Sequence, residues 1–384
     1  MAAPEIDAVL TELSGQISEE IYYRGLNTSV WIDLPETDVW PEGKGHTLKV
    51  MTFGRSLPGS PVVWNDVTAS NGEAGGGCLP PKQRLKINQS LAEFNLQQTA
   101  LESPDLCVND LRDAFEAEEQ LSHVTEVLSE NTRQVWIDRN RDEYTRLANH
   151  KIICKSAGLL DDDTWALTEP DTVLTGGMLR RVYAQLVRLG GGANSYGNVN
   201  GRPTFVAITG METSERIFTE EKFRQDIRWS DQVPELLAPL GAERLFKGFW
   251  LIDDVFPPRW NFTGGAWVRV PAYVWNEDET ELIENTDYDD AEFEDTIIFH
   301  ADVFKSIAPE PPKSVGGAKF DPIKYRGEWD WKNILHREDN PDGNYGFFRG
   351  VFMNGSKPKF PKYGFVLRHL RCGFALEGAA CDES

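Results

Sequence analysis

Apolar side chains recur at intervals of three or four residues in two stretches of the chain, which is the pattern of an amphipathic helix. Residues 4–23 carry one set, made up of Ile6, Leu10, Leu13, Ile17 and Ile21. Residues 177–189 carry the other, with Thr175 in position to cap its start and Gly190 following its end. The segment after the first helix is irregular, so this helix lacks a partner close in sequence and is predicted to form an N-terminal arm.

The middle of the chain predicts a much longer helix. Residues 105–157 contain neither proline nor glycine, and in this stretch acidic residues come first and basic residues last. That order is the one that the helix dipole favours. The prediction is one helix from about 109 to 149, on the order of 60 Å long. Its apolar residues do not keep a strict heptad, so a single helix lying across a sheet is favoured over a coiled coil.

Strand patterns fill most of the remaining sequence. Residues 48–53 and 61–64 form two short runs of strand type within 41–86, a segment rich in Gly, Pro, Ser and Asn, and they predict an extended two-stranded loop. Further strands are expected at 203–209, 246–256, 266–275, 296–304 and 363–372, and a polar helix at 214–227. The elements do not alternate regularly between strand and helix, so the predicted fold class is α+β.

Composition and charge exclude several classes of protein. The 384 residues include 61 acids and 39 bases, a formal net charge of −22, which argues against nucleic-acid binding by the whole surface. Neither an apolar run long enough for a membrane span nor an export signal is visible. The five cysteines are scattered and odd in number, so reduced thiols are expected.

A search for catalytic motifs finds nothing above background. The chain lacks GxxxxGK[ST], GxGxxG after a strand, GxSxG, HExxH and CxxC. The glycine triplets at 75–77 and 190–192 are candidates for cradling a phosphate, but neither opens a helix behind a strand, so a loop tip and a helix end are favoured. We therefore predict no catalytic, cofactor-binding or metal-binding residues, and a protein that is not an enzyme.

Residues 277–295 hold 11 acids in 19 positions. Asp287, Asp289 and Asp290 are close enough in sequence to suggest calcium, but the glycine that an EF-hand loop requires is absent. A solvated surface loop is the favoured interpretation of such a run.

Tryptophan is unusually frequent, with 12 in the chain. Trp260, Trp267 and Trp275 precede this acidic run, and aromatic platforms beside two carboxylates are typical of glycoside hydrolases. No spacing fixes a carboxylate pair, however, and packing in a core or an interface explains the tryptophans equally well.

Residues 343–372 hold six bases and no acid, with aromatic residues between them. This pattern fits either single-stranded nucleic acid or contacts between subunits, and subunit contacts are favoured on so acidic a protein. His300 follows an apolar run and is interpreted as a packed strand histidine rather than a metal ligand or base.

Three blocks of the sequence resemble the major capsid proteins of tailed bacteriophages of the Hong Kong 97 type. The first block comprises 87–90, 106–111 and 118–121; the second comprises 130–133, 136–139 and 148–151; the third comprises 299–300, 329–331, 340–341, 346–348 and 357–372. The resemblance implies a Hong Kong 97-like capsid fold in five parts. These are an N-terminal arm at 1–40, an extended β-hairpin loop at 41–90, a peripheral domain at 91–170, an axial domain at 171–350, and a return to the peripheral domain at 351–384. The peripheral domain contains the long helix at about 109–149 as its spine helix, and the axial domain contains the acidic run 277–295 as an insertion.

The same resemblance implies a structural function. The chain is expected to assemble with copies of itself into the pentamers and hexamers of an icosahedral virion head that encloses double-stranded DNA without sequence-specific binding. Assembly in the host cytoplasm is expected, with a separate scaffold protein, a portal and decoration proteins as further partners. An encapsulin-type compartment shell is the first alternative, and a carbohydrate-active enzyme is the second.

Overall fold

The computed structural model describes residues 30–40, 47–54, 88–103, 106–107, 114–161, 165, 167–189, 195–199, 201–219, 237–238, 241–242, 244–275, 282–300, 303–309, 328–333, 345–360 and 363–371. The arm helix predicted at 4–23, the strand predicted at 61–64 and both glycine triplets lie outside these residues.

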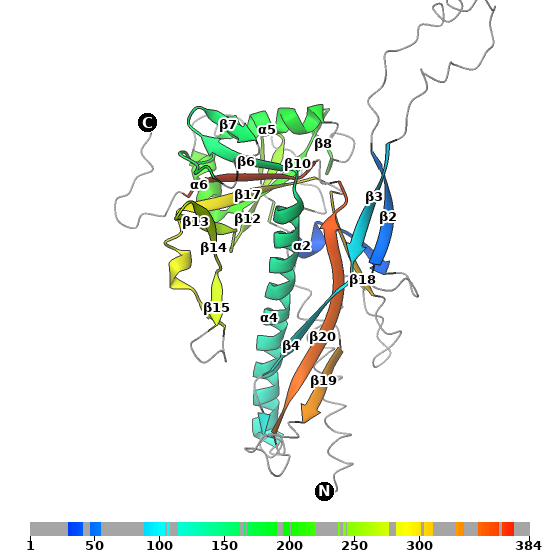
Figure 1. Cartoon of the computed structure of the whole chain (residues 1–384). Helices are drawn as coiled ribbons and strands as arrows, with labels where there is room; N and C mark the ends of the chain where they lie inside the picture. The colour runs from blue at the N-terminus through cyan, green and yellow to red at the C-terminus, as the bar shows by residue number, and fades with distance from the viewer. Residues whose placement is uncertain are drawn as a thin grey trace, which may run out of the picture.

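A nine-stranded mixed sheet forms the larger body of the molecule (Figure 1). Its main path runs β11 (Arg244–Phe246), β12 (Phe249–Asp254), β10 (Phe205–Gly210), β17 (Phe293–Phe299), β21 (Phe365–Leu370), β6 (His150–Lys155) and β7 (Gly158–Asp161), and β13 (Arg259–Thr263) with β14 (Ala266–Val270) branch from β17. Strands β10 and β17 are buried along their whole length, as expected for central strands covered on both faces.

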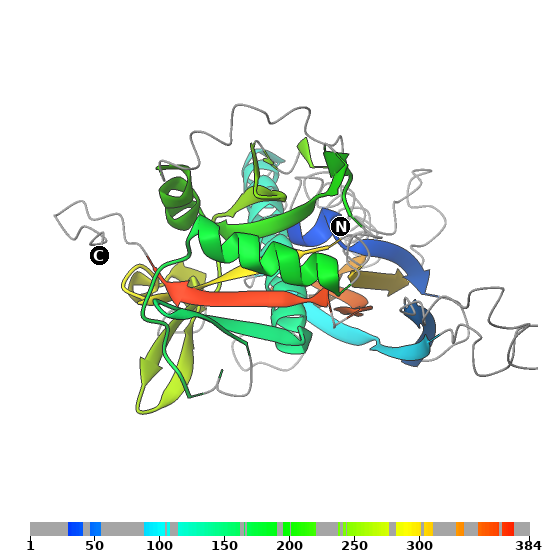
Figure 2. The same ribbon diagram turned by 90° about the horizontal axis from the view of Figure 1, so that it is seen from above.

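Helices cover both faces of this sheet. Figure 2 shows α5 (Gly176–Arg188) lying over the sheet along the direction of β21, and α6 (Met211–Thr219) follows β10 directly. The predicted cap is confirmed, since the Thr175 side chain accepts a hydrogen bond from the Met178 amide. Leu179, Val182 and Leu186 form the buried face of α5. Helix α6 covers 211–219, and the rest of the helix predicted at 214–227 lies outside the described residues.

A second, six-stranded sheet forms a long ribbon built on β20 (Tyr345–Pro358). Its strands are β1 (Glu36–Trp40), β18 (Phe304–Pro309), β20 and β19 (Glu328–Asn333), with β4 (Gln97–Glu102) and β5 (Leu106–Cys107) also paired to β20. The predicted long helix is confirmed as α4 (Ala114–Leu147), which lies beside β20 and β4 (Figure 1). Its C-terminal end reaches the other sheet, where the Tyr144 hydroxyl donates to the Ile298 carbonyl.

The strand predicted at 48–53 is confirmed, but its partner is a strand at 88–95 that was not predicted, and the run at 61–64 lies outside the described residues. Strands β2 (Thr47–Gly54) and β3 (Asn88–Asn95) pair antiparallel over eight residues each and form a sheet of their own beside β20 (Figure 1). A small cluster of the buried residues Trp40, Phe94 and Ile307 anchors it, with Leu48, Val50 and Leu96 packed against the cluster.

Two predicted strands divide at turns. The run at 246–256 is the hairpin of β11 and β12, whose turn places Lys247 at φ 50° and Gly248 at φ 95°. Glycine is required there because a Cβ at position 248 would lie 2.2 Å from the Tyr183 ring. The run at 266–275 divides into β14 and β15 (Tyr273–Trp275), which pairs with β16 (Leu282–Glu284).

The remaining short elements connect the two bodies or border the sheets. They are α2 (Val30–Asp33), β8 (Asn198–Val199), β9 (Arg202–Pro203) and the 3-10 turn η6 (Thr286–Tyr288). In α2, Trp31 and Ile32 are buried against the main core, which Tyr144 and Leu179 also enter from α4 and α5. The structure is therefore a strand-rich mixed α/β fold with few helices.

Candidate functional site

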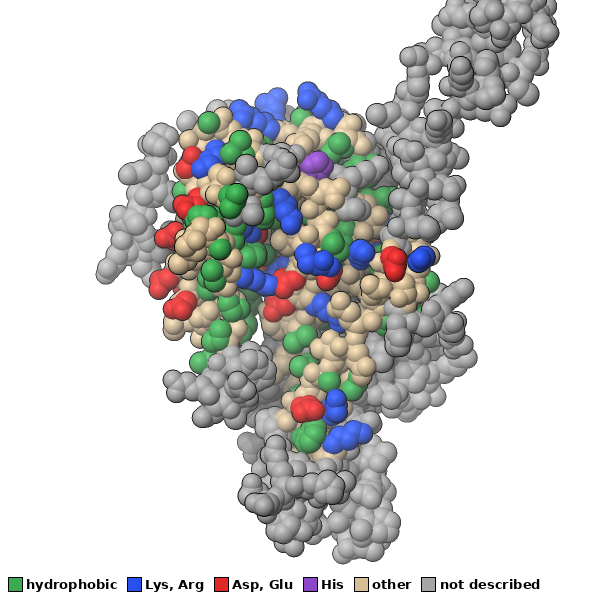
Figure 3. Space-filling view, in the orientation of Figure 1, with side chains coloured by type: hydrophobic (Ala, Val, Ile, Leu, Met, Phe, Trp, Pro, Cys, Tyr) green, Lys and Arg blue, Asp and Glu red, His purple; other side chains and the backbone are tan. Residues whose placement is uncertain are grey.

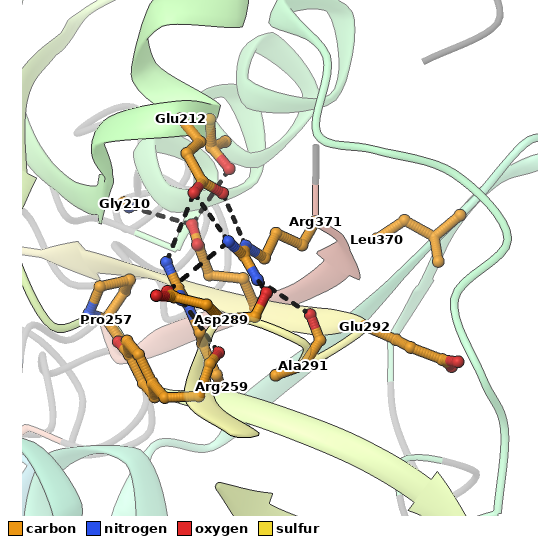
Figure 4. A network of polar contacts seen from close by, with 12 residues as sticks. Gly210, Glu212, Pro257, Arg259, Asp289, Ala291, Glu292, Leu370 and Arg371 are labelled. Atoms are coloured by element: carbon orange, nitrogen blue, oxygen red, sulfur yellow. Dashed lines mark hydrogen bonds and ion pairs between the residues drawn. The ribbon is translucent and has the colours of Figure 1, made fainter. Parts of the chain in front are cut away.

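A network of charged side chains gathers at one end of the nine-stranded sheet (Figure 4). Its centre is Glu294 on β17, whose Oε1 accepts hydrogen bonds of 3.0 Å from the Gly210 amide and from the Thr213 hydroxyl. Position 210 has to be glycine, because a Cβ there would lie 2.5 Å from the Glu294 carboxylate. The turn from β10 into α6 therefore wraps directly around this carboxylate.

Two arginines connect this network to neighbouring elements. The Arg371 guanidinium donates to both oxygens of Glu212, at 2.6 and 2.8 Å, and also to the backbone carbonyl of Asp289. Arg259 forms an ion pair of 2.8 Å with Asp289 and lies 3.7 Å from Glu212. The pairs fasten α6, β13, the turn after η6 and the end of β21 to one another.

Burial raises the pKa of Glu294 to about 7, against hydrogen bonds from Gly210 and Thr213 that act to lower it. A carboxylic acid with such a pKa is suited to general acid–base chemistry. Glu294 is 0% exposed, however, so substrate has no access to it. Its position is that of a structural group in the core.

A second buried cluster surrounds Arg368 on β21. Its Nε and Nη2 donate to the two oxygens of Asp295, at 2.7 and 2.9 Å, and Trp260 Nε1 donates to the same carboxylate at 2.7 Å. The rings of Trp165, Trp260 and Trp267 lie 4.1–4.3 Å from the guanidinium carbon, which is the geometry of cation–π contacts. Trp260 and Trp267 are half-buried and pack their rings against this guanidinium, so packing explains both tryptophans.

The prediction that 277–295 is a solvated loop is wrong at its C-terminal end. Glu294 and Asp295 lie inside β17 and are 0% exposed, because the amides and arginines around them replace water. Glu284, Asp287, Asp290 and Glu292 are exposed, as predicted. Among the described residues, no three His, Cys, Asp or Glu side chains are grouped as metal ligands.

The interpretation of 343–372 as a basic surface for subunit contacts is also wrong for its arginines near the end. Arg368 and Arg371 are 1% and 9% exposed and bind carboxylates of the same chain. Two lysines of the segment are likewise held within the chain, since Lys359 pairs with Glu36 at 2.7 Å and Lys357 donates to the Glu93 carbonyl. Neither a partner subunit nor nucleic acid is needed to explain these bases.

The packed-histidine interpretation of His300 is confirmed. The ring is 1% exposed and stacks against Phe205 and Tyr363, at centroid distances of 5.6 and 5.2 Å.

His369, which the sequence did not single out, is also buried, and burial lowers its pKa to about 4. Cys154 is a buried free thiol whose pKa burial raises to about 12. Such a thiol is a poor nucleophile at neutral pH.

A cluster of four charges fastens the first strand of the ribbon. Lys305 on β18 lies 3.1 Å from Glu36 and 2.8 Å from Asp38, both on β1, and Lys359 adds its pair with Glu36. Hydrogen bonds from Lys359 and Lys305 outweigh the burial of Glu36 and lower its pKa, and Lys305 lowers the pKa of Asp38 in the same way. The sequence gives no signal for this cluster, because Glu36 lies 269 residues from Lys305 and 323 residues from Lys359.

In the described part of the chain, α4 and the other helices are too polar or too short to cross a lipid bilayer.

Comparison with known proteins gives matches to solved structures only. No family model matches the chain, and no curated protein matches it. The capsid of Ralstonia phage GP4 matches with 10% identity and a TM-score of 0.48, covering 90% of this chain and 89% of that chain. The head structure of Helicobacter pylori bacteriophage KHP40 matches with 10% identity and a TM-score of 0.45, covering 91% and 94%. A virus-like particle from Pyrococcus furiosus matches with 12% identity and a TM-score of 0.38, covering 94% and 99%.

Proposed function

We propose that this chain is the major subunit of an icosahedral shell of the tailed-phage capsid type. The observation that carries the proposal is the β2–β3 hairpin. It pairs with neither large sheet in the described part of the chain, and a cluster of only three buried side chains among the described residues anchors its base. An isolated two-stranded hairpin is marginal in water, so this one needs cover from another molecule. A neighbouring copy in a shell would supply that cover.

The division of the chain into a compact sheet and a long ribbon supports the same function. The 34-residue helix α4 and the 14-residue strand β20 run side by side, away from the nine-stranded sheet (Figure 1). Such a ribbon offers long edges for contact while the sheet keeps its own core. When each copy uses different patches on its neighbours, the contacts close into rings. Many weak contacts then stabilise a closed shell together.

The shell is proposed to enclose double-stranded DNA as the head of a virion and to assemble in the host cytoplasm. A separate scaffold protein, a portal and decoration proteins are proposed partners, on the strength of the sequence resemblance. An encapsulin-type compartment would use the same geometry with a protein cargo. The contents of purified particles, DNA or protein, separate these two functions, and so do the neighbouring genes.

The test is assembly of the purified protein, alone and after co-expression with a candidate scaffold. We expect negative-stain electron microscopy to show shells, tubes or rings, and light scattering to give a mass far above the 43.3 kDa of one chain. A protein that stays monomeric under both conditions and binds a small carbohydrate would contradict the proposal and favour an enzyme.

A further inference from the structure

The outward face of α5 is basic on a strongly acidic protein. The helix sequence contains three arginines and no acidic residue. Its exposed positions, which recur every three or four residues, are Gly177, Arg180, Arg181, Ala184, Val187 and Arg188. We call this set the α5 face. Small residues at 177 and 184 leave room for another surface to approach the helix closely, with arginines on either side.

The arginines of the α5 face have no partner among the described residues. Arg180, Arg181 and Arg188 form neither an ion pair nor a hydrogen bond with any of them. Two exposed arginines elsewhere are paired, Arg146 with Glu143 at 2.8 Å and Arg349 with Glu102 at 3.5 Å. The α5 face therefore carries positive charge that the described part of its own chain does not neutralise.

A complementary acidic surface lies elsewhere on the molecule. Glu284, Asp287, Asp290 and Glu292 are exposed, and none of their carboxylates binds a cation within the described part of the chain. We call this set the acidic edge. Figure 4 shows the Glu292 side chain pointing away from the arginine network. In Figure 3, basic side chains lie along the top, over α5, and acidic side chains lie along the left side, over the segment that contains η6.

We infer that the α5 face of one copy docks on the acidic edge of a second copy. The inference rests on the proposed self-assembly and identifies one of its contacts. Because the two surfaces lie at different places on one chain, the contact is heterologous and continues from copy to copy around a ring. Opposite charges also fix the register of such a contact and reject wrong partners.

A protein partner fits the α5 face better than nucleic acid does. Val187 is 37% exposed beside Arg188, and Leu189, at the end of the helix, is 39% exposed. Apolar side chains beside arginines are typical of protein interfaces, where arginine is enriched and lysine depleted. A phosphate backbone would leave these apolar groups without a matching surface.

The experiment uses two charge-reversed variants of the full chain, R180E/R188E and D287K/D290K/E292K. In either variant alone, the α5 face and the acidic edge carry the same sign, so we expect the assembled fraction to fall at least tenfold. In an equimolar mixture, each α5 face can meet an acidic edge of opposite sign on the other variant. We therefore expect the mixture to recover assembly, with the two variants alternating in rings of six, as mass photometry and electron microscopy would show.

The matched control is R146E/K155E, which changes the net charge as much as R180E/R188E does and breaks two pairs outside the ribbon strands, Arg146 with Glu143 and Lys155 with Asp171. It should assemble like the wild type. Circular dichroism and thermal unfolding should show all variants folded, because exposed substitutions rarely change stability by more than about 0.5 kcal/mol.

Two outcomes would overturn the inference. One is wild-type assembly by R180E/R188E, and a reduced DNA content of those particles would assign the arginines to nucleic acid. The other is a mixture that remains unassembled while each variant is folded. These results leave the proposed function standing, whereas a wild-type chain that stays monomeric even with its scaffold contradicts both.

Discussion

In the nine-stranded sheet, the ion pair between Arg368 and Asp295 is 1% and 0% exposed, whereas in the ribbon the pair between Arg349 and Glu102 is 44% and 52% exposed. The sheet encloses its charges with tryptophan rings and backbone amides, and its core is continuous from α5 to α4. The hairpin has a small core, and water can reach the Arg349–Glu102 pair of the ribbon. The sheet thus holds its own core together, and the ribbon is the part of the molecule that the proposed subunit contacts would complete.

The largest effect should come from breaking the buried pair. We expect Asp295→Ala to lower the free energy of unfolding by about 3–5 kcal/mol, because it leaves the Arg368 guanidinium buried without a carboxylate. Glu102→Ala, which breaks the exposed pair in the ribbon, should cost less than about 1 kcal/mol. Urea denaturation of both variants measures the difference. Equal losses for the two variants would mean that the sheet and the ribbon do not differ in this respect.

Phenylalanine-to-alanine substitutions, one in the core of the nine-stranded sheet and one at the base of the hairpin, test the same difference. Phe299 packs between Tyr144 and Trp31 in the main core, with ring centroids at 4.8 and 5.6 Å. Phe299→Ala should cost about 3–5 kcal/mol of global stability. Phe94→Ala loosens the anchor of the hairpin, so we expect a small change in global unfolding, fast amide exchange in β2 and β3, and loss of assembly.

Hydrogen exchange and electron microscopy measure these two consequences of Phe94→Ala separately. Normal shells formed by a variant with a loosened hairpin would contradict the role given to the hairpin.

The sequence was informative about elements with a regular pattern. The long helix, α5 and the buried strands β10, β12, β17 and β21 were each predicted at or near their positions, because period and apolar runs depend only on neighbours along the chain. Strand β20, the longest in the ribbon, was missed. Gly346, Gly350 and Gly355 interrupt its pattern, and its pairing with β4 and β18 depends on residues far away in sequence.

The nine-stranded sheet should also show a pH-dependent stability that comes from its buried carboxyl group, Glu294. Burial raises the pKa of Glu294 from an ordinary value of 4.5 to about 7. Its contribution to stability is therefore fully present below pH 4.5 and is lost as the pH rises to about 7. Over this pH interval the free energy of unfolding falls by about 3 kcal/mol. Glu294→Gln, which resembles the protonated acid, should gain stability relative to the wild type as the pH rises from 5 to 8.

The exposed neighbour Glu292 supplies the control for this measurement, since Glu292→Gln should follow the wild type across the same range. Thermal unfolding at matched pH values would detect the difference. A constant offset between Glu294→Gln and the wild type would mean that Glu294 is ionised in the folded protein throughout.

A smaller effect than at Glu294 is expected at the charge cluster on β1. Lys305→Met removes the cation that holds Glu36 and Asp38, so we expect amide exchange in β1 to rise roughly tenfold, equivalent to about 1.4 kcal/mol, with little change in global unfolding. Because the pKa values of both carboxylates are lowered, their stabilisation is present at neutral pH and is lost as the pH falls below their ordinary values of 4.5 and 3.8. Hydrogen exchange at pH 3 and pH 7 measures this loss. A cooperative global loss in Lys305→Met would show that β1 belongs to the same folding unit as the sheet.

The buried charges show why the candidate site was harder to predict than the fold. Glu294 and Asp295 end a run of acids, and a run of this kind indicates solvent exposure when it is considered alone. Their burial depends on Arg259 and Arg368, which lie 35 and 73 residues away in sequence. Charge count along the chain does not contain this information, whereas the position of Asp295 opposite Arg368 in the β17–β21 register does.

The position of β21 in its sheet also has a consequence for the synthesis of the chain. This strand lies between β17 and β6, and β6 belongs to a segment made more than 200 residues earlier. Until residue 370 leaves the ribosome, the sheet remains divided, with β6 and β17 lacking the strand that joins them. Sheets of such high contact order fold slowly and leave strand edges open while they wait. A nascent chain of this protein therefore has its greatest need of chaperone protection before β21 has been made.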